Sequence, residues 1–259
     1  MENSQTFLIV LTIGKVFLMS VIGSGPIIWG RKEECDLQFR HEVKHEISNS
    51  DMLILRQRLR AVMHPDPHAI NGQYEIRSLY FDNLDDKALR EKLDGVSIRE
   101  KYRIRFYNHD PSVIHLERKF KHGGLGYKDS TTLTEAQARA IESGDIAWMA
   151  NSADEVILGF YFRIRNEGLA PKVIVDYTRV PFVFAPGNVR VTLDYHIRTA
   201  LRSTDFLNPN CTTIPVPDAP CILEVKWDNF LPDVIRDAVQ LGDRHAAAYS
   251  KYAACRMYD

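Results

Sequence analysis

The sequence predicts an α+β fold in which mostly antiparallel strands are surrounded by helices. Three observations predict it: runs of alternating apolar and polar residues recur along the chain, short amphipathic stretches lie between these runs, and no internal repeat or long linker follows residue 35. Residues 36–259 are therefore expected to form one domain. Residues 1–34 are treated as a separate extension.

Seven stretches alternate with the two-residue period of a strand. They cover residues 37–47, 73–82, 97–107, 112–121, 172–181, 188–195 and 221–227. A glycine-rich segment at 123–126 lacks the Lys-Ser/Thr pair and the helix that follow a phosphate-binding loop, so we expect a hairpin turn there. The Pro-rich segment 208–220 is expected to be a loop.

Five helices are predicted between or after these strands. Ser48 or Ser50 can cap an amphipathic helix that runs to Val62, and Thr134 can cap another that runs towards Ile141. The remaining three are expected at residues 152–165, at residues 232–241 with a proline in the first turn, and in the Ala-rich stretch 244–255.

The composition is that of a globular protein with a sizeable core. The chain has 259 residues, of which 45% are hydrophobic and 26% charged, and this excludes a disordered or collagen-like protein. Lys and Arg number 33 against 34 Asp and Glu, so no nucleic-acid partner is expected. The four cysteines have no metal-site spacing; they are predicted to be reduced thiols, with a disulfide between Cys211 and Cys221 as the alternative.

The N-terminal extension contains an almost wholly apolar stretch at residues 7–29, which as a helix would be about 34 Å long. Lys15 lies near its middle, residues 23–26 interrupt its second half, and it has neither the basic start nor the cleavage site of a signal peptide. We therefore interpret it either as a membrane anchor or as a non-native start. If it spans a membrane, Arg31 and Lys32 favour a cytoplasmic domain anchored to the inner face.

At least five predicted strands separate a charged face from an apolar one. In the third, Arg99, Lys101, Arg103 and Arg105 share one face, where four like charges repel one another unless an anion lies against them. For any single strand a solvated sheet face is the alternative. Because the pattern recurs, we favour a nearly closed barrel with a charged, hydrated interior. Such a lining suits a chain of phosphates with a divalent cation.

Seven short phrases lie along these charged strands and in the last predicted helix. They are Phe39-Arg-His-Glu-Val-Lys-His45, Ile76-Arg-Ser-Leu-Tyr-Phe-Asp82, Lys101-Tyr-Arg-Ile-Arg105, Leu116-Glu-Arg-Lys119, Asp176-Tyr-Thr-Arg179, Leu223-Glu-Val-Lys226 and Ser250-Lys-Tyr252. In order and spacing they resemble the VTC domain, the catalytic domain of the vacuolar transporter chaperone polyphosphate polymerase and a branch of the triphosphate tunnel metalloenzymes. The resemblance implies an antiparallel β-barrel tunnel of about eight strands with a charged interior. It also implies an activity that moves the terminal phosphoryl group of ATP onto polyphosphate with Mn²⁺ or Mg²⁺.

The resemblance further implies roles for individual residues. The residues expected to be catalytic and to hold phosphates are Lys44, Arg103, Arg105, Lys119 and Arg179. Glu224 is the principal expected metal ligand, with Glu42 and Glu117 as further candidates. Arg190 and Lys226 are expected to line the tunnel, and Ser250 and Lys251 to close one end. We also expect Asp194 to support Arg190, or otherwise to join the metal ligands.

One departure bears on the choice of activity. Arg40 occupies the first acidic position of the Glu-x-Glu-x-Lys found in the triphosphatase branch, which favours the polymerase branch. Phosphoryl transfer needs positioning and charge neutralisation, so we assign no nucleophilic side chain. With water as acceptor the same tunnel would be an inorganic triphosphatase or nucleoside triphosphatase, and without turnover it would be a polyphosphate sensor. Glu224 favours an enzyme, because a pure anion binder gains little from a buried carboxylate. The sequence identifies no protein partner.

Overall fold

The computed structural model describes residues 8–13, 16–21, 40–242 and 245–258. The chain divides into two units, Met1–Leu37 and Gln38–Asp259. In the first unit, β1 (Leu8–Ile13) and β2 (Val16–Val21) pair in antiparallel fashion. Among the described residues, no helix has the length and apolar character needed to cross a membrane. The rest of the apolar stretch lies outside the described residues, so the choice between an anchor and a non-native start remains a prediction.

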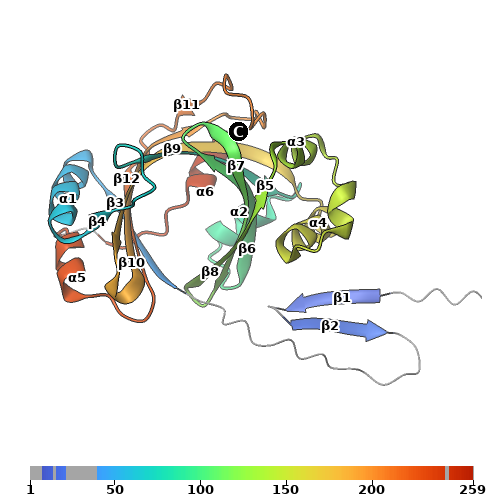
Figure 1. The fold of residues 1–259 in the computed structure, drawn as a ribbon, viewed down its shortest axis with the longest axis horizontal. Coiled ribbons are helices and arrows are strands. Elements are labelled where there is room, and N and C mark those ends of the chain that lie inside the picture. Colours follow the sequence, from blue (N-terminus) through green and yellow to red (C-terminus); the bar gives the residue numbers. More distant parts are fainter. Residues whose placement is uncertain (1–7, 14–15, 22–39, 243–244, 259) are drawn as a thin grey trace, which may run out of the picture. The chain divides into compact units, whose positions relative to one another are not determined.

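The second unit is built on an antiparallel sheet that curls into a half-barrel (Figure 1). Its eight main strands follow the spatial order β3-β12-β10-β9-β5-β6-β7-β8. In chain order they are β3 (His41–Ile47), β5 (Tyr74–Asp82), β6 (Arg99–Tyr107), β7 (Asp110–His122), β8 (Leu125–Leu133), β9 (Ala170–Phe184), β10 (Val189–Thr199) and β12 (Cys221–Trp227). Two-residue strands, β4 (His64–Pro65) and β11 (Ile214–Pro215), pair at its side. The edge strands meet where Arg40 and Gly126 exchange backbone hydrogen bonds of 3.0 and 3.2 Å.

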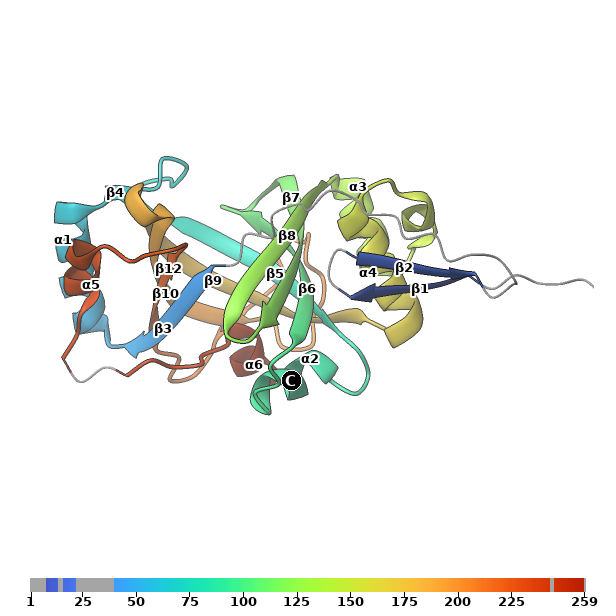
Figure 2. The same ribbon diagram turned by 90° about the horizontal axis from the view of Figure 1, so that it is seen from below.

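Helices cover the convex face in two groups (Figures 1 and 2). The first group is α1 (Asn49–Val62) and α5 (Asp233–Val239), which pack on β9, β10 and β12. The second is α3 (Glu135–Ser143), the 3₁₀ helix η1 (Ala147–Asn151) and α4 (Glu155–Glu167), which pack on β5, β6 and β7. A further 3₁₀ turn, η2 (Pro186–Asn188), joins β9 to β10. The predicted α+β class with an antiparallel, helix-covered barrel is confirmed.

The last helix lies on the concave side and closes part of it. Tyr252 and Cys255 of α6 (Lys251–Arg256) are buried against Val175 and Ile222 of the sheet, and α2 (Lys87–Leu93) lies beside α6. Burial of apolar surface stabilises this arrangement by about 25 cal/mol per Å². The concave face is therefore apolar where α6 packs, and its charged part is confined to the remaining space.

The predicted helix starts are confirmed at two positions. Ser48 accepts a hydrogen bond from the backbone N–H of Asp51 at 3.1 Å, and the Asp51 carboxylate accepts one from the Ser48 N–H at 2.9 Å. Thr134 and Gln137 form the same reciprocal pair at the start of α3. Each pair satisfies two backbone donors that the helix itself leaves free.

Other elements differ from the sequence prediction. β8 was not predicted, because Lys128 and Ser130 on one face and Asp129 and Thr131 on the other make both faces largely polar. It continues from β7 through the predicted turn at Gly123 and Gly124. α2 was not predicted either. The alternative disulfide is wrong, since Cys211 and Cys221 are free thiols.

The Ala-rich segment departs most clearly from its prediction. Only Lys251–Arg256 is helical, whereas residues 245–250 are not; Arg244 lies outside the described residues. The backbone N–H of Ala247 donates to the carbonyl of Lys44 at 2.7 Å, so the segment lies along the edge of β3. Pairing with a sheet edge has overridden the helix propensity of alanine, which is a weak preference.

Candidate functional site

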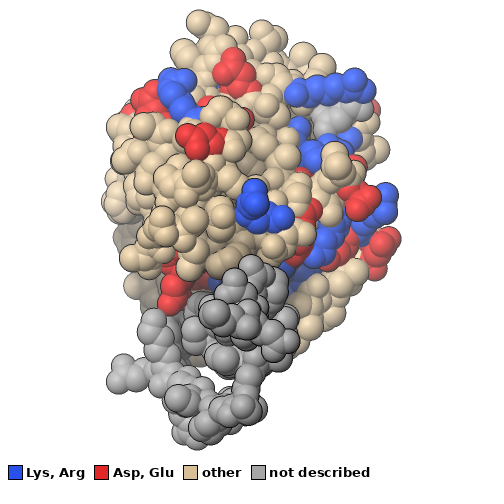
Figure 3. Space-filling view, turned by 90° about the vertical axis from the view of Figure 1, so that its right-hand side faces the viewer, with Lys and Arg blue, Asp and Glu red and all other residues tan. Residues whose placement is uncertain are grey.

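A cavity of about 160 Å³ opens in the concave face of the half-barrel. Its lining includes ten Lys or Arg side chains and three Glu side chains. Figure 3 shows a band of Lys and Arg side chains, with Asp and Glu between them, along one side of the face in view. The formal net charge of −1 thus averages over a strong local separation of charge, and the concave face attracts anions.

Most of the residues predicted for the site line this cavity. They are Glu42, Lys44, Arg103, Lys119, Arg179, Glu224, Lys226, Ser250 and Lys251. Arg105, Glu117 and Arg190 are not among the lining residues. Four cations that the site prediction did not include also line it: Lys92, Arg99, Lys101 and Lys121. Arg99, Lys101 and Lys121 alternate with predicted residues on β6 and β7, so the strand period already places them on the inward faces, although no role was predicted for them.

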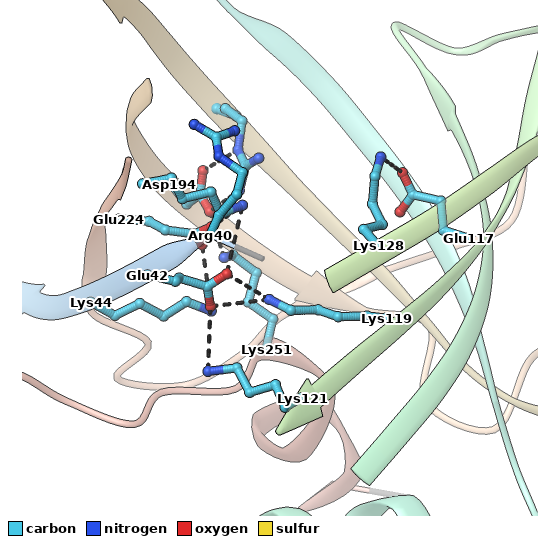
Figure 4. A network of polar contacts seen from close by, with 12 residues as sticks. Arg40, Glu42, Lys44, Glu117, Lys119, Lys121, Lys128, Asp194, Glu224 and Lys251 are labelled. Carbon is cyan, nitrogen blue, oxygen red and sulfur yellow. Dashed lines mark hydrogen bonds and ion pairs between the residues drawn. The ribbon is translucent and has the colours of Figure 1, made fainter. Parts of the chain in front are cut away.

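Glu42 of β3 lies at the centre of a cluster of lysines (Figure 4). Its carboxylate is 2.7 Å from Nζ of Lys119 and 3.3 Å from Nζ of Lys44, with Lys226 at 3.8 Å and Lys121 at 3.9 Å. Burial and the nearby Glu224 tend to raise the pKa of Glu42, but these lysines hold it well below its usual range. Glu42 is therefore ionised at any ordinary pH.

Glu224 lies on the neighbouring strand β12 and is ionised for the same reason. Its carboxylate forms ion pairs with Lys226, with Lys44 at 3.4 Å and with Arg179 at 3.9 Å. Burial opposes its ionisation, but the surrounding cations hold the pKa of Glu224 well below its usual range. Lys44 bridges the two carboxylates, and together they raise its pKa despite burial. Two carboxylates and a shared lysine thus form a compact ionised group.

The donor chemistry of this pair fits a divalent cation. Mg²⁺ is usually bound through one or two carboxylates together with water and the phosphates of the substrate, and Glu42 and Glu224 provide two adjacent carboxylates. In the described part of the chain, no group of three or more His, Cys, Asp or Glu side chains is placed to hold a metal ion. Any ion held here would therefore need further oxygens from the substrate or from water.

Glu117, the third carboxylate predicted to bind metal, lies apart from this pair (Figure 4). It binds Arg103 at 2.6 Å and Lys128 at 2.9 Å, with Arg105 at 3.9 Å. Burial acts to raise the pKa of Glu117, but these cations hold it well below its usual value. Glu117 thus holds the side chains of Arg103 and Arg105 in place before any anion binds. Less side-chain entropy is then lost when these arginines bind an anion.

Asp194 of β10 is fully buried and binds two other cations of the site. Its carboxylate accepts hydrogen bonds from Nε and a terminal nitrogen of Arg179 at 2.6 and 2.7 Å, and one from Lys251 at 2.5 Å. The expectation that Asp194 supports Arg190 is wrong, because Arg190 instead forms an ion pair with Asp66 at 3.0 Å. Asp194 therefore joins β9 to the start of α6.

Almost the whole of the second unit matches a known protein family. The family model of the VTC domain matches residues 39–258. The chain belongs to the VTC domain family. This confirms the family predicted from the seven phrases. No curated protein matches the sequence.

Three solved structures to which this VTC domain is similar have low sequence identity to it. A Hippeastrum protein named as an adenylyl cyclase, with a dominant triphosphatase activity, is 14% identical, has a TM-score of 0.50, and aligns over 85% of this chain and 95% of its own. A protein of Bacillus halodurans named as an adenylate cyclase is 12% identical, has a TM-score of 0.44, and aligns over 77% of this chain and 86% of its own. A Pyrococcus horikoshii protein is 11% identical, has a TM-score of 0.44, and aligns over 82% of this chain and 96% of its own.

The VTC domain is expected to lose stability in acid through Asp194. Burial acts to raise the pKa of Asp194, but Arg179 and Lys251 lower it from 3.8 to about 2. A carboxyl group whose pKa is lower in the folded than in the unfolded state stabilises the fold fully at any pH above its unfolded pKa. For Asp194 this stabilisation is lost as the pH falls from about 4, its unfolded pKa, to about 2, its folded pKa. Urea unfolding of the wild type and of Asp194→Asn between these pH values would measure it. The difference in unfolding free energy should shrink as the pH falls; a constant difference would contradict the assignment.

Proposed function

We propose that this VTC domain is a metal-dependent polyphosphate polymerase that transfers the terminal phosphoryl group of ATP onto a polyphosphate chain. One observation supports it most strongly: a cavity lined by ten cations holds two adjacent ionised carboxylates, Glu42 and Glu224. Polyphosphate and the triphosphate of ATP carry a negative charge on every phosphate, and a divalent cation is their usual companion in phosphoryl transfer. The site suits this pair of substrates.

The predicted cations would act by positioning and neutralisation. Arg103, Lys119 and Arg179 lie on three different strands around the cavity, so they can contact successive phosphates of a bound chain. The terminal oxygen of the polyphosphate would attack the γ-phosphorus of ATP, and the bond from that phosphorus to the β,γ-bridging oxygen would break, leaving ADP. Glu42 and Glu224 would hold a divalent cation, Mn²⁺ or Mg²⁺, which would neutralise charge on the phosphate oxygens.

The structural surroundings of Arg40 favour the polymerase over a hydrolase. Arg40 replaces the first glutamate of the triphosphatase pattern, and its guanidinium forms an ion pair with Asp228 at 2.7 Å. The residue that directly precedes β3 is therefore a cation in place of a second acidic ligand. The triphosphatase remains the second candidate, because the Hippeastrum protein of similar fold has that activity. A polyphosphate sensor is the third. A cytoplasmic location, where ATP is available, is part of the proposal, with residues 7–29 either as a membrane anchor or as a non-native start.

One experiment separates these candidates. The full chain is incubated with ATP and Mn²⁺, and the products are resolved on a gel stained for polyphosphate. A growing ladder supports the polymerase, release of free phosphate alone supports the triphosphatase, and tight binding of ATP without turnover supports the sensor. A parallel incubation with a chelator reports whether any turnover needs the metal.

A further inference from the structure

The Tyr80 hydroxyl lies among the cations of the cavity without a carboxylate beside it. Tyr80 on β5 is 4% exposed and lines the cavity. Its oxygen accepts a hydrogen bond from Arg103 at 2.7 Å, and Nζ of Lys101 lies 5.3 Å from the centre of its ring. Its ring stacks on that of Tyr252 at 5.1 Å between centres. Packing thus fixes the ring and points its oxygen at Arg103.

Among the described residues, no group accepts a hydrogen bond from the Tyr80 hydroxyl, and Lys101 has no carboxylate within ion-pair distance. A buried phenol whose proton has no acceptor, and whose oxygen faces cations, is stabilised in its ionised form. Burial alone would raise the pKa of Tyr80, but Arg103, Lys101 and Arg105 lower it to about 7. Above this pH the phenolate adds a negative charge beside Lys101, for which the described residues provide no ion pair, and beside Arg103, which already pairs with Glu117.

We propose that Tyr80 is ionised in the empty cavity and takes up a proton when phosphates bind to Arg103 and Lys101, so that its hydroxyl then donates a hydrogen bond to a phosphate oxygen. This inference rests on the proposed function in so far as the ligand is a chain of phosphates. The proton comes from solvent, and no bond to phosphorus is formed or broken. Incoming phosphates bring further negative charge to these two cations and beside the phenolate, which raises the pKa of Tyr80 and restores its proton.

Tyr252 and Tyr177 also line the cavity, so the test has to separate their hydroxyls from that of Tyr80. Tyr252 of α6 donates to Asp82 at 2.6 Å, and burial and that carboxylate raise its pKa far above neutrality. Tyr177 of β9 accepts from Arg105 at 3.1 Å. Lys251, also on α6, lies over the Tyr177 ring at 4.6 Å and binds Asp194.

Lysines of the cavity would mask a simple proton count, because the pKa values of Lys101, Lys119 and Lys121 are all lowered. Burial lowers the pKa of Lys101 to about 8, with Arg103 and Lys44 acting in the same direction and Tyr80 against it. A bound phosphate would raise this pKa too, so Lys101 would also take up some proton. The near-ultraviolet absorbance band of tyrosinate, which neutral tyrosine lacks, does not report on lysine. Because Arg105 also lowers the pKa of Tyr107, the variant Tyr80→Phe is needed to assign the band to Tyr80.

The test uses the full chain and inorganic tripolyphosphate at a pH of about 8, one unit above the pKa of about 7 for Tyr80. The free protein is expected to show the absorbance of about one tyrosinate per chain, and saturating tripolyphosphate should remove it. Tyr80→Phe should show neither the band nor its loss. Tyr252→Phe is the matched control, because it removes the hydroxyl of the stacked neighbour; it should retain both the band and the loss.

The outcomes distinguish this inference from the proposed function. Binding is followed separately by calorimetry. If tripolyphosphate binds and the tyrosinate band is absent or unchanged, the role of Tyr80 is overturned while the phosphate-binding cavity stands. If a tyrosinate is present but tripolyphosphate does not bind, the proposed function fails and the coupling of Tyr80 to phosphate fails with it. A band that persists in Tyr80→Phe would assign the ionisation to another tyrosine and overturn the inference.

Discussion

Replacing Glu224 with Gln is expected to reduce phosphoryl transfer by more than about 100-fold, because loss of a group that merely orients a metal ligand already costs about 10- to 100-fold. Glutamine has nearly the shape of glutamate but no charge, so it cannot hold a divalent cation in the same way. It also leaves Lys44 and Lys226 with Glu42 as their remaining carboxylate partner in the cluster. The measurement is the initial rate of ADP formation from ATP with saturating Mn²⁺.

The fold of this variant should remain intact. Glu42 lies 3.3 Å from Lys44 and 3.8 Å from Lys226, so neither lysine loses all its compensation. Glu46→Gln is the matched control, since Glu46 is an exposed glutamate of β3 outside the cavity lining, and it should leave the rate unchanged. Full activity of Glu224→Gln, with circular dichroism like that of the wild type, would remove Glu224 from the reaction.

Strand periodicity explains why so much of the cavity could be predicted from the sequence. In β6 the side chains of Lys101, Arg103 and Arg105 occupy every second position, and a strand sends such positions to one face whatever its neighbours are. The opposite face supplies Tyr102 and Ile104, which are buried under the convex helices. Local alternation thus decided which side chains point inward.

Contacts between distant strands could not be predicted in this way. The pairing of Arg190 with Asp66, and not with Asp194, depends on where the loop after β4 lies relative to β10. Likewise the role of Tyr80 depends on β5 lying beside β6, which places its hydroxyl against Arg103. The sequence predicts Arg190 to line the tunnel and gives no role to Tyr80, because strand order and register decide the partners of both residues.

Replacing Arg179 with Met is expected to lower the free energy of unfolding by about 3 kcal/mol, the cost of removing one partner of a buried ion pair. Asp194 is fully buried and accepts two hydrogen bonds from Arg179. In Arg179→Met both bonds are lost, and Lys251 is the cation that still pairs with Asp194. Urea unfolding at neutral pH measures the loss. Phosphate binding should weaken as well, since Arg179 lines the cavity.

Arg179→Lys distinguishes charge from geometry at this position. Lysine keeps the positive charge but cannot donate two parallel hydrogen bonds to one carboxylate. The unfolding free energy of Arg179→Lys should therefore lie between those of the wild type and Arg179→Met. Arg165→Met provides the surface control, because Arg165 is exposed on α4, and it should change stability by no more than about 0.5 kcal/mol. If Arg179→Met were as stable as Arg165→Met, the pair with Asp194 would contribute nothing to the fold.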